Sequence, residues 1–352
     1  MLARRLLKYW GGPRCQNQRD RGGARSTPGF QQPSKRCLVL LLTGLVSAGL
    51  VCNPLAAAEQ IRPTGVPTPP DNEETSTPKA KSSPKKRTAR RSTTSDEAAA
   101  PLGTLPNGVP ITKAVSVMVI DAQTGRSLYE KNPDESRAAA STQKLLTALI
   151  VAERGYLDAS VTVQQVDTLA EPVKLNIKPG DTYQRIDLLR ALLVKSPNDV
   201  ARCLARDYAG SAEAFAEVMN RRAQQLGAIH SHFVNPNGLP DPRQYSSARD
   251  LSLIARAAYA NPTIRSIVCM PQYVFRFANG RTRELENTNK VLKKLPYCNG
   301  MKTGYTEAAG HCLIASGTRP GRDVIAVVLG DSKAGIWRDA SVLLQWALWT
   351  QG

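Results

Sequence analysis

Histidine is scarce in this sequence, which contains only His230, His232 and His311 among its 352 residues. None of the three belongs to a recognisable nucleophile motif, so a Ser-His-Asp hydrolase is disfavoured. Cysteine and histidine also form no closely spaced set of the kind that binds zinc. We therefore expect neither a metal site nor a cofactor.

Long hydrophobic runs are nearly absent. The exception, residues 38–51, has fourteen uncharged residues, which is too short a helix to cross the hydrocarbon core of a membrane. Lys35 and Arg36 precede this run and alanines follow it at 56–58, the layout of a signal peptide cleaved after Ala58. The sequence thus predicts export to the periplasm or cell envelope, with an uncleaved N-terminal membrane anchor as the alternative.

Aromatic residues make up only 5% of the chain, whereas the formal net charge is +18. Seventeen of the 47 Lys and Arg residues lie before residue 111, and the densest cluster is Lys79, Lys81, Lys85, Lys86, Arg87, Arg90 and Arg91. Because this cluster lies in a Pro-, Ser- and Thr-rich segment with no aromatic platform, we expect no nucleic-acid partner. A solvated linker that touches a membrane surface or an anionic envelope polymer fits the pattern better.

These features divide the chain into three parts. Residues 1–58 form a basic leader with the signal peptide or anchor, residues 59–110 a disordered linker, and residues 111–352 a folded domain long enough to bury a substantial core. The folded part contains Cys203, Cys269, Cys298 and Cys312. Four cysteines permit three two-disulfide pairings or none, and Cys203 lies in an apolar helical pattern typical of a buried free thiol.

The folded part begins with a β-hairpin and ends with strands and a helix. The hairpin is expected at 114–121 and 127–131, around the turn Gln123-Thr124-Gly125, and further strands at 310–317 and 324–329. Helices are expected at 138–154, 185–195, 199–209, 212–226, 247–260 and 336–349. This order predicts an α+β fold, with an antiparallel sheet flanked by helices, an all-helical subdomain, and a cleft between them.

Ser141 and Lys144 lie three residues apart near the start of an expected helix, so their side chains share one face. A serine hydroxyl needs a base to act as a nucleophile at neutral pH. A lysine amine serves only if burial or nearby positive charge lowers its pKa. Ser82 and Lys85 in the linker have the same spacing, so the distinguishing feature is the apolar helix face that would bury Lys144.

Two further segments carry candidate polar groups. In Ser196-Pro197-Asn198, the Ser196 hydroxyl could relay a proton and the Asn198 amide could hold a substrate or Lys144, although a helix cap and turn is the simpler interpretation. Lys302-Thr303-Gly304 precedes the late strands and is typical of an edge strand, with a surface turn as the alternative. An edge strand could pair with an extended peptide and bind its carboxylate.

In this order, the three motifs resemble the signatures of penicillin-binding proteins and active-site-serine β-lactamases. Longer stretches resemble the low-mass D-alanyl-D-alanine carboxypeptidases in particular. LLVKSPND at 192–199 and GMKTGYT at 300–306 contain the second and third motifs, and Met219-Asn220 with Leu226-Gly227, FVNPNGL at 233–239 and NTN at 287–289 lie between them. The similarity spans about residues 111–349. Gln143 and Pro197 depart from the residues usual in that family.

The resemblance implies a β-lactamase/transpeptidase-like fold and a serine-type D-alanyl-D-alanine carboxypeptidase that acts on peptidoglycan stem peptides through an acyl-enzyme and binds β-lactams. It implies that Ser141 is the nucleophile, Lys144 its base and Ser196 a proton relay to the leaving amine. Substrate contacts are implied for Asn198, Lys302, Thr303, Gly304 and Tyr305. The backbone N–H groups of Ser141 and Tyr305 would form the oxyanion hole.

Three alternatives remain open. A D,D-endopeptidase acting on peptidoglycan cross-links would use the same residues in a different cleft. A class A β-lactamase is disfavoured because no E-x-x-L-N sequence lies between Asn198 and Lys302. Outside enzymes, the alternative is a protein that binds envelope polymers through its basic segment, which detection in the cytosol with residues 38–51 intact would favour.

Overall fold

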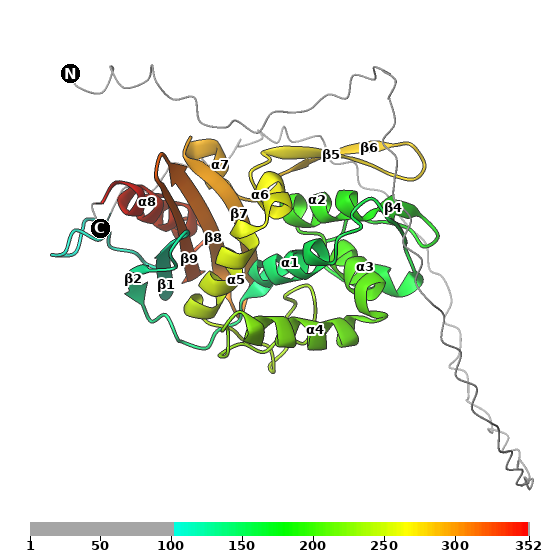
Figure 1. The fold of residues 1–352 in the computed structure, drawn as a ribbon, viewed down its shortest axis with the longest axis horizontal. Coiled ribbons are helices and arrows are strands. Elements are labelled where there is room, and N and C mark those ends of the chain that lie inside the picture. Colours follow the sequence, from blue (N-terminus) through cyan, green and yellow to red (C-terminus); the bar gives the residue numbers. More distant parts are fainter. Residues whose placement is uncertain (1–101, 351–352) are drawn as a thin grey trace, which may run out of the picture. The chain divides into compact units, whose positions relative to one another are not determined.

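The computed structural model describes residues 102–350, and the predicted leader and most of the predicted linker lie outside these residues. The boundaries at 58 and 110 therefore stay predictions. Five strands form the main sheet: β1 (Ser116–Asp121), β2 (Ser127–Lys131), β7 (Cys298–Thr306), β8 (Gly310–Arg319) and β9 (Arg322–Asp331). All neighbours are antiparallel, and the order β2-β1-β9-β8-β7 places β7 at an edge (Figure 1).

Helices cover both faces of this sheet. On one face, α8 (Gly335–Trp349) buries Leu343 and Leu344 against alternate residues of the strands, and on the other, α5 (Ala248–Ala260) packs against β1 and β9. Successive strand residues point to opposite faces, so a strand covered on both sides is apolar throughout. Residues 324–329 of β9 are accordingly all buried.

The helical subdomain is built around α1 (Lys144–Arg154), whose first eight residues are all buried. A helix that is buried on every side belongs to the centre of a domain. Helices α2 (Arg185–Lys195), α3 (Asn198–Ala209) and α4 (Ala212–Gln225) pack against it. The short helices α6 (Pro262–Val268) and α7 (Val291–Lys294) lie in the connection from α5 to β7.

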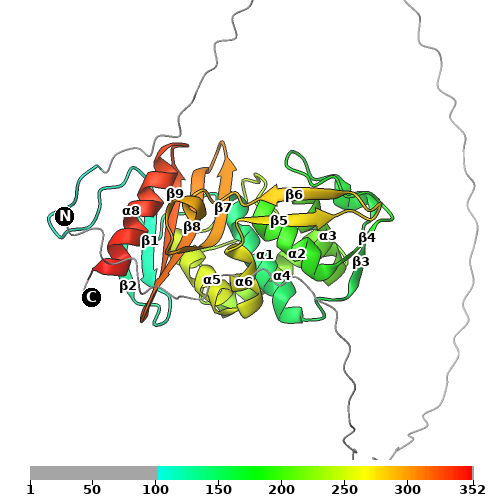
Figure 2. The ribbon, with the colours of Figure 1, turned by 90° about the horizontal axis from the view of Figure 1, so that it is seen from above.

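Two small hairpins lie outside the main sheet (Figure 2). They are β3 (Ser160–Thr162) with β4 (Thr182–Gln184), and β5 (Gln272–Arg276) with β6 (Thr282–Glu286). The prediction of an all-helical subdomain is wrong for β3 and β4. A strand of three residues is too short to show a period-two pattern.

The expected helix at 138–154 also differs from the structure. Residues Ala140–Gln143 form a 3₁₀ segment, η1, and the α-helix begins only at Lys144. Ala140 has a φ of 47°, in the left-handed region that non-glycine residues rarely adopt. The chain therefore turns sharply just before Ser141. The other predicted helices begin and end within one or two residues of those observed.

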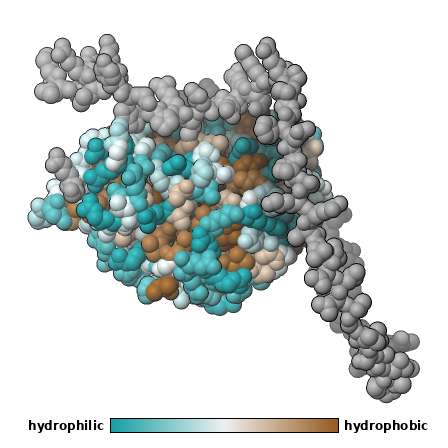
Figure 3. Space-filling model, in the orientation of Figure 1, coloured by the Kyte–Doolittle hydropathy of each residue, from teal (hydrophilic) through white to brown (hydrophobic). Residues whose placement is uncertain are grey.

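Cys203, Cys298 and Cys312 are buried free thiols, which confirms the expectation for Cys203 and excludes two disulfides among the four cysteines of the folded part. Within residues 102–350, none of the helices has the length and apolar character that crossing a membrane requires. Most large apolar side chains are buried, and on the face shown in Figure 3 hydrophobic residues are interspersed with hydrophilic ones.

Candidate active site

The Lys144 amine has three close oxygen neighbours. Its Nζ lies 2.7 Å from Ser141 Oγ, 2.8 Å from Asn198 Oδ1 and 2.6 Å from the backbone oxygen of Asn237. Lys144 is completely buried, at 0% exposure. The predicted pair of hydroxyl and amine is therefore in direct contact, at the point where η1 passes into α1.

The Ser196-Pro197-Asn198 segment joins α2 to α3. Ser196 is the C-cap of α2 in a left-handed conformation, and Asn198 is the first residue of α3. The Asn198 backbone N–H donates to Val173 O at 2.7 Å, which helps to hold its side chain toward Lys144. Ser196 is buried, but within the described residues its Oγ makes no hydrogen bond. The structure thus brings Asn198 to the amine and leaves the Ser196 hydroxyl unpaired.

The loop of residues 233–239 supplies the third contact of the amine. Asn237 contributes its backbone oxygen, which also lies 3.4 Å from Ser141 Oγ, while its side chain donates to Asn198 O at 2.8 Å. Gly238 follows with a φ of 82°, and a Cβ there would lie only 2.0 Å from Ala140 O. Only glycine lets the loop approach this closely to the residue before Ser141.

Strand β7 carries the Lys302-Thr303-Gly304 motif past η1. The Lys302 side chain is completely buried and its Nζ donates to Thr303 O at 2.9 Å, while Thr303 Oγ1 donates to Thr288 Oγ1 at 2.7 Å. A Cβ on Gly304 would lie 2.9 Å from Ser141 N. The edge-strand interpretation is confirmed, and the absent side chain lets the strand backbone lie directly against the serine.

Tyr305 lies at the exposed end of the motif. Its side chain is 56% exposed and its ring stacks on His311, with ring centroids 4.3 Å apart. Burial and the nearby charge of Lys333 lower the pKa of His311. His311 is thus a neutral stacking partner at neutral pH.

Both lysines of the site have lowered pKa values. Burial, and then the positive charge of Lys302, hold the pKa of Lys144 well below its usual 10.5. Burial lowers the pKa of Lys302 to about 7. Taking two like charges out of water together is unfavourable. The neutral form of Lys144 is therefore favoured, and a neutral amine can accept a proton from the serine hydroxyl.

Comparison with known proteins identifies a family. The model of the D-alanyl-D-alanine carboxypeptidase family matches residues 106–333. The chain belongs to this serine peptidase family. It is 35% identical to the D-alanyl-D-alanine carboxypeptidase DacB2 of Mycobacterium tuberculosis over 252 residues, which covers 70% of this chain and 85% of that protein. It is also 32% identical to a D-alanyl-D-alanine endopeptidase of Escherichia coli over 241 residues, covering 66% and 76%.

Solved structures of a D-alanyl-D-alanine carboxypeptidase and of a DD-transpeptidase share the fold. A carboxypeptidase from Mycobacterium tuberculosis superposes with a TM-score of 0.65 at 33% identity, covering 70% of this chain and 94% of that one. A mutant of a Streptomyces DD-transpeptidase gives a TM-score of 0.64 at 30% identity, covering 68% and 98%. These matches confirm the α+β fold and the family resemblance inferred from the sequence.

Sequence reasoning missed two contributors to this carboxypeptidase-family site. Asn237 acts through its backbone oxygen, which carries no residue-type signal, although the FVNPNGL stretch marked the loop. Thr288 contacts Thr303 from the NTN stretch, which resembled the family but suggested no role. Within the described residues, no cluster of three His, Cys, Asp or Glu side chains is arranged to hold a metal ion.

Proposed function

We propose that this protein is an exported D-alanyl-D-alanine carboxypeptidase in which Ser141 is the nucleophile and Lys144 the base. The observation that carries the proposal is the buried amine with a lowered pKa, 2.7 Å from the Ser141 hydroxyl. Family membership supplies the substrate, a peptidoglycan stem peptide ending in D-alanyl-D-alanine.

The arrangement around Lys144 explains how the proton moves. A neutral amine has two N–H bonds and one lone pair. Asn198 Oδ1 and Asn237 O can each accept a hydrogen bond from one of the two N–H groups, so the lone pair is left facing Ser141 Oγ. The hydroxyl then donates its proton to Lys144 as Oγ attacks the carbonyl carbon, and the resulting ester is the acyl-enzyme.

The edge strand β7 fits the rest of the substrate. An extended peptide can add to its free edge, with the terminal carboxylate held by the Lys302 ammonium and the Thr303 hydroxyl. Because Gly304 brings the strand against Ser141 N, the N–H groups of Ser141 and Tyr305 can share the developing oxyanion. Each such donor contributes about 3–4 kcal/mol to transition-state stabilisation.

The amine of the leaving D-alanine needs a proton. After the attack, Lys144 holds the proton that it took from Ser141. The unpaired Ser196 hydroxyl can accept that proton and donate its own to the departing nitrogen. Water then attacks the ester with Lys144 again as base, which releases the shortened peptide and restores Ser141. β-Lactams, whose strained amide imitates the scissile bond, acylate the same serine.

The test is the intact mass of the protein after exposure to benzylpenicillin. Wild type should gain one penicillin per chain, and Ser141→Ala should gain none while keeping its melting temperature. Undiminished labelling of Ser141→Ala would remove this serine from its role.

Endopeptidase action is the second candidate, because two of the relatives are named D-alanyl-D-alanine endopeptidases. Released D-alanine and cleaved cross-linked dimers can be measured on the same purified peptidoglycan fragments. Release of D-alanine from uncrosslinked pentapeptide supports the carboxypeptidase. Cleavage of the dimers alone would replace it with the endopeptidase.

An envelope location completes the proposal. The uncharged run at 38–51 and the alanines at 56–58 support export to the periplasm or cell envelope, and the basic linker supports contact with a membrane surface. N-terminal sequencing of the protein from its native cells tests this: a start at Glu59 supports cleavage, and an intact leader supports an anchor.

A further inference from the structure

One of the three contacts of the Lys144 amine is a backbone carbonyl, that of Asn237, 2.6 Å from Nζ. A side chain can change rotamer independently, but a backbone carbonyl moves only with its loop. The interactions that hold the loop of residues 233–239 in place therefore also fix the position of the Asn237 oxygen relative to the Lys144 amine. The hydrogen bonds that hold this loop lead back to a residue inside the nucleophile motif.

That residue is Gln143, which lies between Ser141 and Lys144 and is completely buried. Its Nε2 donates to Asn235 O at 2.6 Å and to Gln244 Oε1 at 3.2 Å. The turn that carries both the hydroxyl and the amine is thus tied through one side chain to the loop that faces them.

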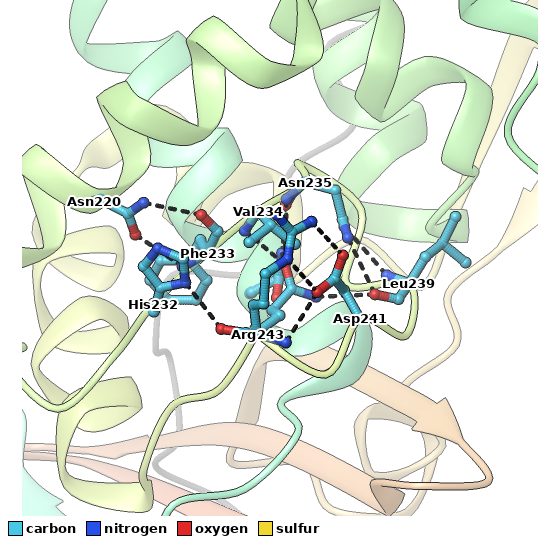
Figure 4. Close-up of polar contacts among 10 residues, drawn as sticks. Asn220, His232, Phe233, Val234, Asn235, Leu239, Asp241 and Arg243 are labelled. Carbon is cyan, nitrogen blue, oxygen red and sulfur yellow. Dashed lines mark hydrogen bonds and ion pairs between the residues drawn. The ribbon is translucent and has the colours of Figure 1, made fainter.

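Gln244 and Asn235 extend this connection through the loop. Gln244 Oε1 accepts from Val234 N at 3.1 Å and Asn235 N at 3.3 Å, and its Nε2 donates to Leu239 O at 2.9 Å. Asn235 Oδ1 accepts from the next turn of the loop, the N–H groups of Asn237, Gly238 and Leu239. Figure 4 shows Asn235 and Leu239 facing each other across the loop, joined by hydrogen bonds.

We propose that Gln143 is a positioning residue for acylation: through Asn235 and Gln244 it sets where the Asn237 carbonyl lies, and so where the lone pair of Lys144 points. This inference rests on the proposed function, because it takes Ser141 and Lys144 as the acylating pair. It also gives a role to Gln143, the residue at which the nucleophile motif departs from what is usual in the family.

Losing the Gln143 donor has two separate consequences. The Asn235 carbonyl is left unpaired and the loop relaxes, and a displacement of about 1 Å in a reacting geometry costs about 100-fold in rate. A carbonyl oxygen also stabilises the charged amine more than the neutral one, so a weaker contact lowers the pKa of Lys144 further. The acid limb of the acylation rate, which reports that pKa, then moves to lower pH.

The test uses Gln143→Met, which keeps the length of the side chain and removes the donor. The second-order rate of acylation by a fluorescent penicillin is measured across pH in the full-length protein. We expect a plateau about 100-fold lower and an acid limb at lower pH than in wild type. Gln244→Met removes the partner and carries the same prediction if Gln143→Met does not fold.

Asn220→Ala is the matched control. Asn220 makes two hydrogen bonds with the backbone of Phe233 in the same loop, at 2.8 and 2.9 Å (Figure 4), and these do not involve Gln143 or Asn237. The Asn220→Ala variant should have a lower melting temperature, while the acid limb of its acylation rate keeps its wild-type position. Gln143 and Gln244 should also be non-additive in a double-mutant cycle, because both hold one loop.

The outcomes separate the two proposals. A wild-type acid limb in both glutamine variants, or the same shift in Asn220→Ala, overturns the positioning role and leaves the proposed function intact. Wild-type protein that takes up no penicillin overturns the proposed function itself. A lower plateau together with a limb shift confined to the glutamine variants supports the positioning role.

Discussion

Lys144 is a buried amine without a carboxylate partner within the described residues, and its three oxygen neighbours compensate for the loss of water. An ionised group in such a site is costly, so the amine responds by shifting its pKa downward. The same physical condition makes it stable in the core and useful as a base.

Replacing Lys144 with methionine separates these two roles. Lys144→Met keeps most of the volume but removes the proton acceptor, so acylation by benzylpenicillin should fall by about 10²–10⁴-fold. Stopped-flow acylation rates and thermal melts measure the two effects. A rate within tenfold of wild type would mean that another group acts as base.

The two lysines predict a bell-shaped pH profile. Activity should rise as Lys144 becomes neutral, and kcat/KM should fall above about pH 7 because Lys302, with a pKa of about 7 in the free protein, loses the charge that binds the substrate carboxylate. A bound carboxylate favours charged Lys302, so the alkaline limb of kcat should lie at higher pH. D-alanine release measured across pH gives both profiles.

Lys302→Met provides the control for that assignment. It should raise KM at neutral pH and remove the alkaline limb near pH 7. An alkaline limb that stays in place in Lys302→Met would show that a different group titrates there.

The sequence pointed to the side chains around the Lys144 amine but not to the backbone carbonyl that contacts it. The spacing and chemistry of Ser141, Lys144 and Asn198 single them out, and the structure brings both Ser141 and Asn198 within hydrogen-bonding distance of the Lys144 amine. The Asn237 carbonyl could not be chosen in this way, because every residue has a carbonyl and only the fold selects one.

Among the elements, η1 and β7 make the contact on which the site depends. The 3₁₀ turn presents Ser141 N to the strand, and Gly304 leaves the space that this approach needs. The sequence marked Gly304 through its motif. It did not reveal η1, since periodicity continues smoothly from 138 to 154 and the left-handed Ala140 follows from packing against Gly238 and β7.

Gly304→Ala should disturb the contact between η1 and β7. The added Cβ would lie 2.9 Å from Ser141 N and 3.0 Å from Thr142 N, so the backbone must shift. We expect kcat/KM to fall about 100-fold and stability to fall by about 1–3 kcal/mol.

Gly321→Ala, in the β8–β9 turn, is the matched control for this substitution. Gly321 has a φ of 76° and nothing lies within 4 Å of an added Cβ, so the variant should lose about 1 kcal/mol of stability and keep its activity. Equal activity losses in the two glycine variants would show that stability, and not the η1–β7 contact, is responsible.

The free energy of unfolding of the described domain should vary with pH because of a buried pair of acidic side chains, Asp331 at the end of β9 and Asp339 in α8. Burial and the neighbouring charge of Asp339 raise the pKa of Asp331 to about 6. The folded state therefore holds this proton more tightly than the unfolded chain does. The stabilisation is complete below about pH 4 and is lost as pH rises through 6.

Asp331→Asn should remove this dependence. The amide keeps the oxygen that accepts from Ser332 N and carries no charge, so the variant should gain about 1–3 kcal/mol over wild type at pH 7.5 and little at pH 4. Denaturant melts at the two pH values measure the difference. A gain that is the same at both would rule out titration of Asp331 as its source.

The order of elements predicted the α+β architecture, because strands at both ends of the domain must meet to form one sheet around the helices. The outer hairpins were not predicted, since short strands with exposed faces carry little pattern. Ser141 lies in η1, three residues before the start of the central helix α1, and η1 packs against the edge strand β7. A ring-opened penicillin that is esterified at Ser141 and has its carboxylate at Lys302 would link the helical subdomain to the sheet. Amide hydrogen exchange in α1 and β7 should therefore slow together when the penicillin is bound.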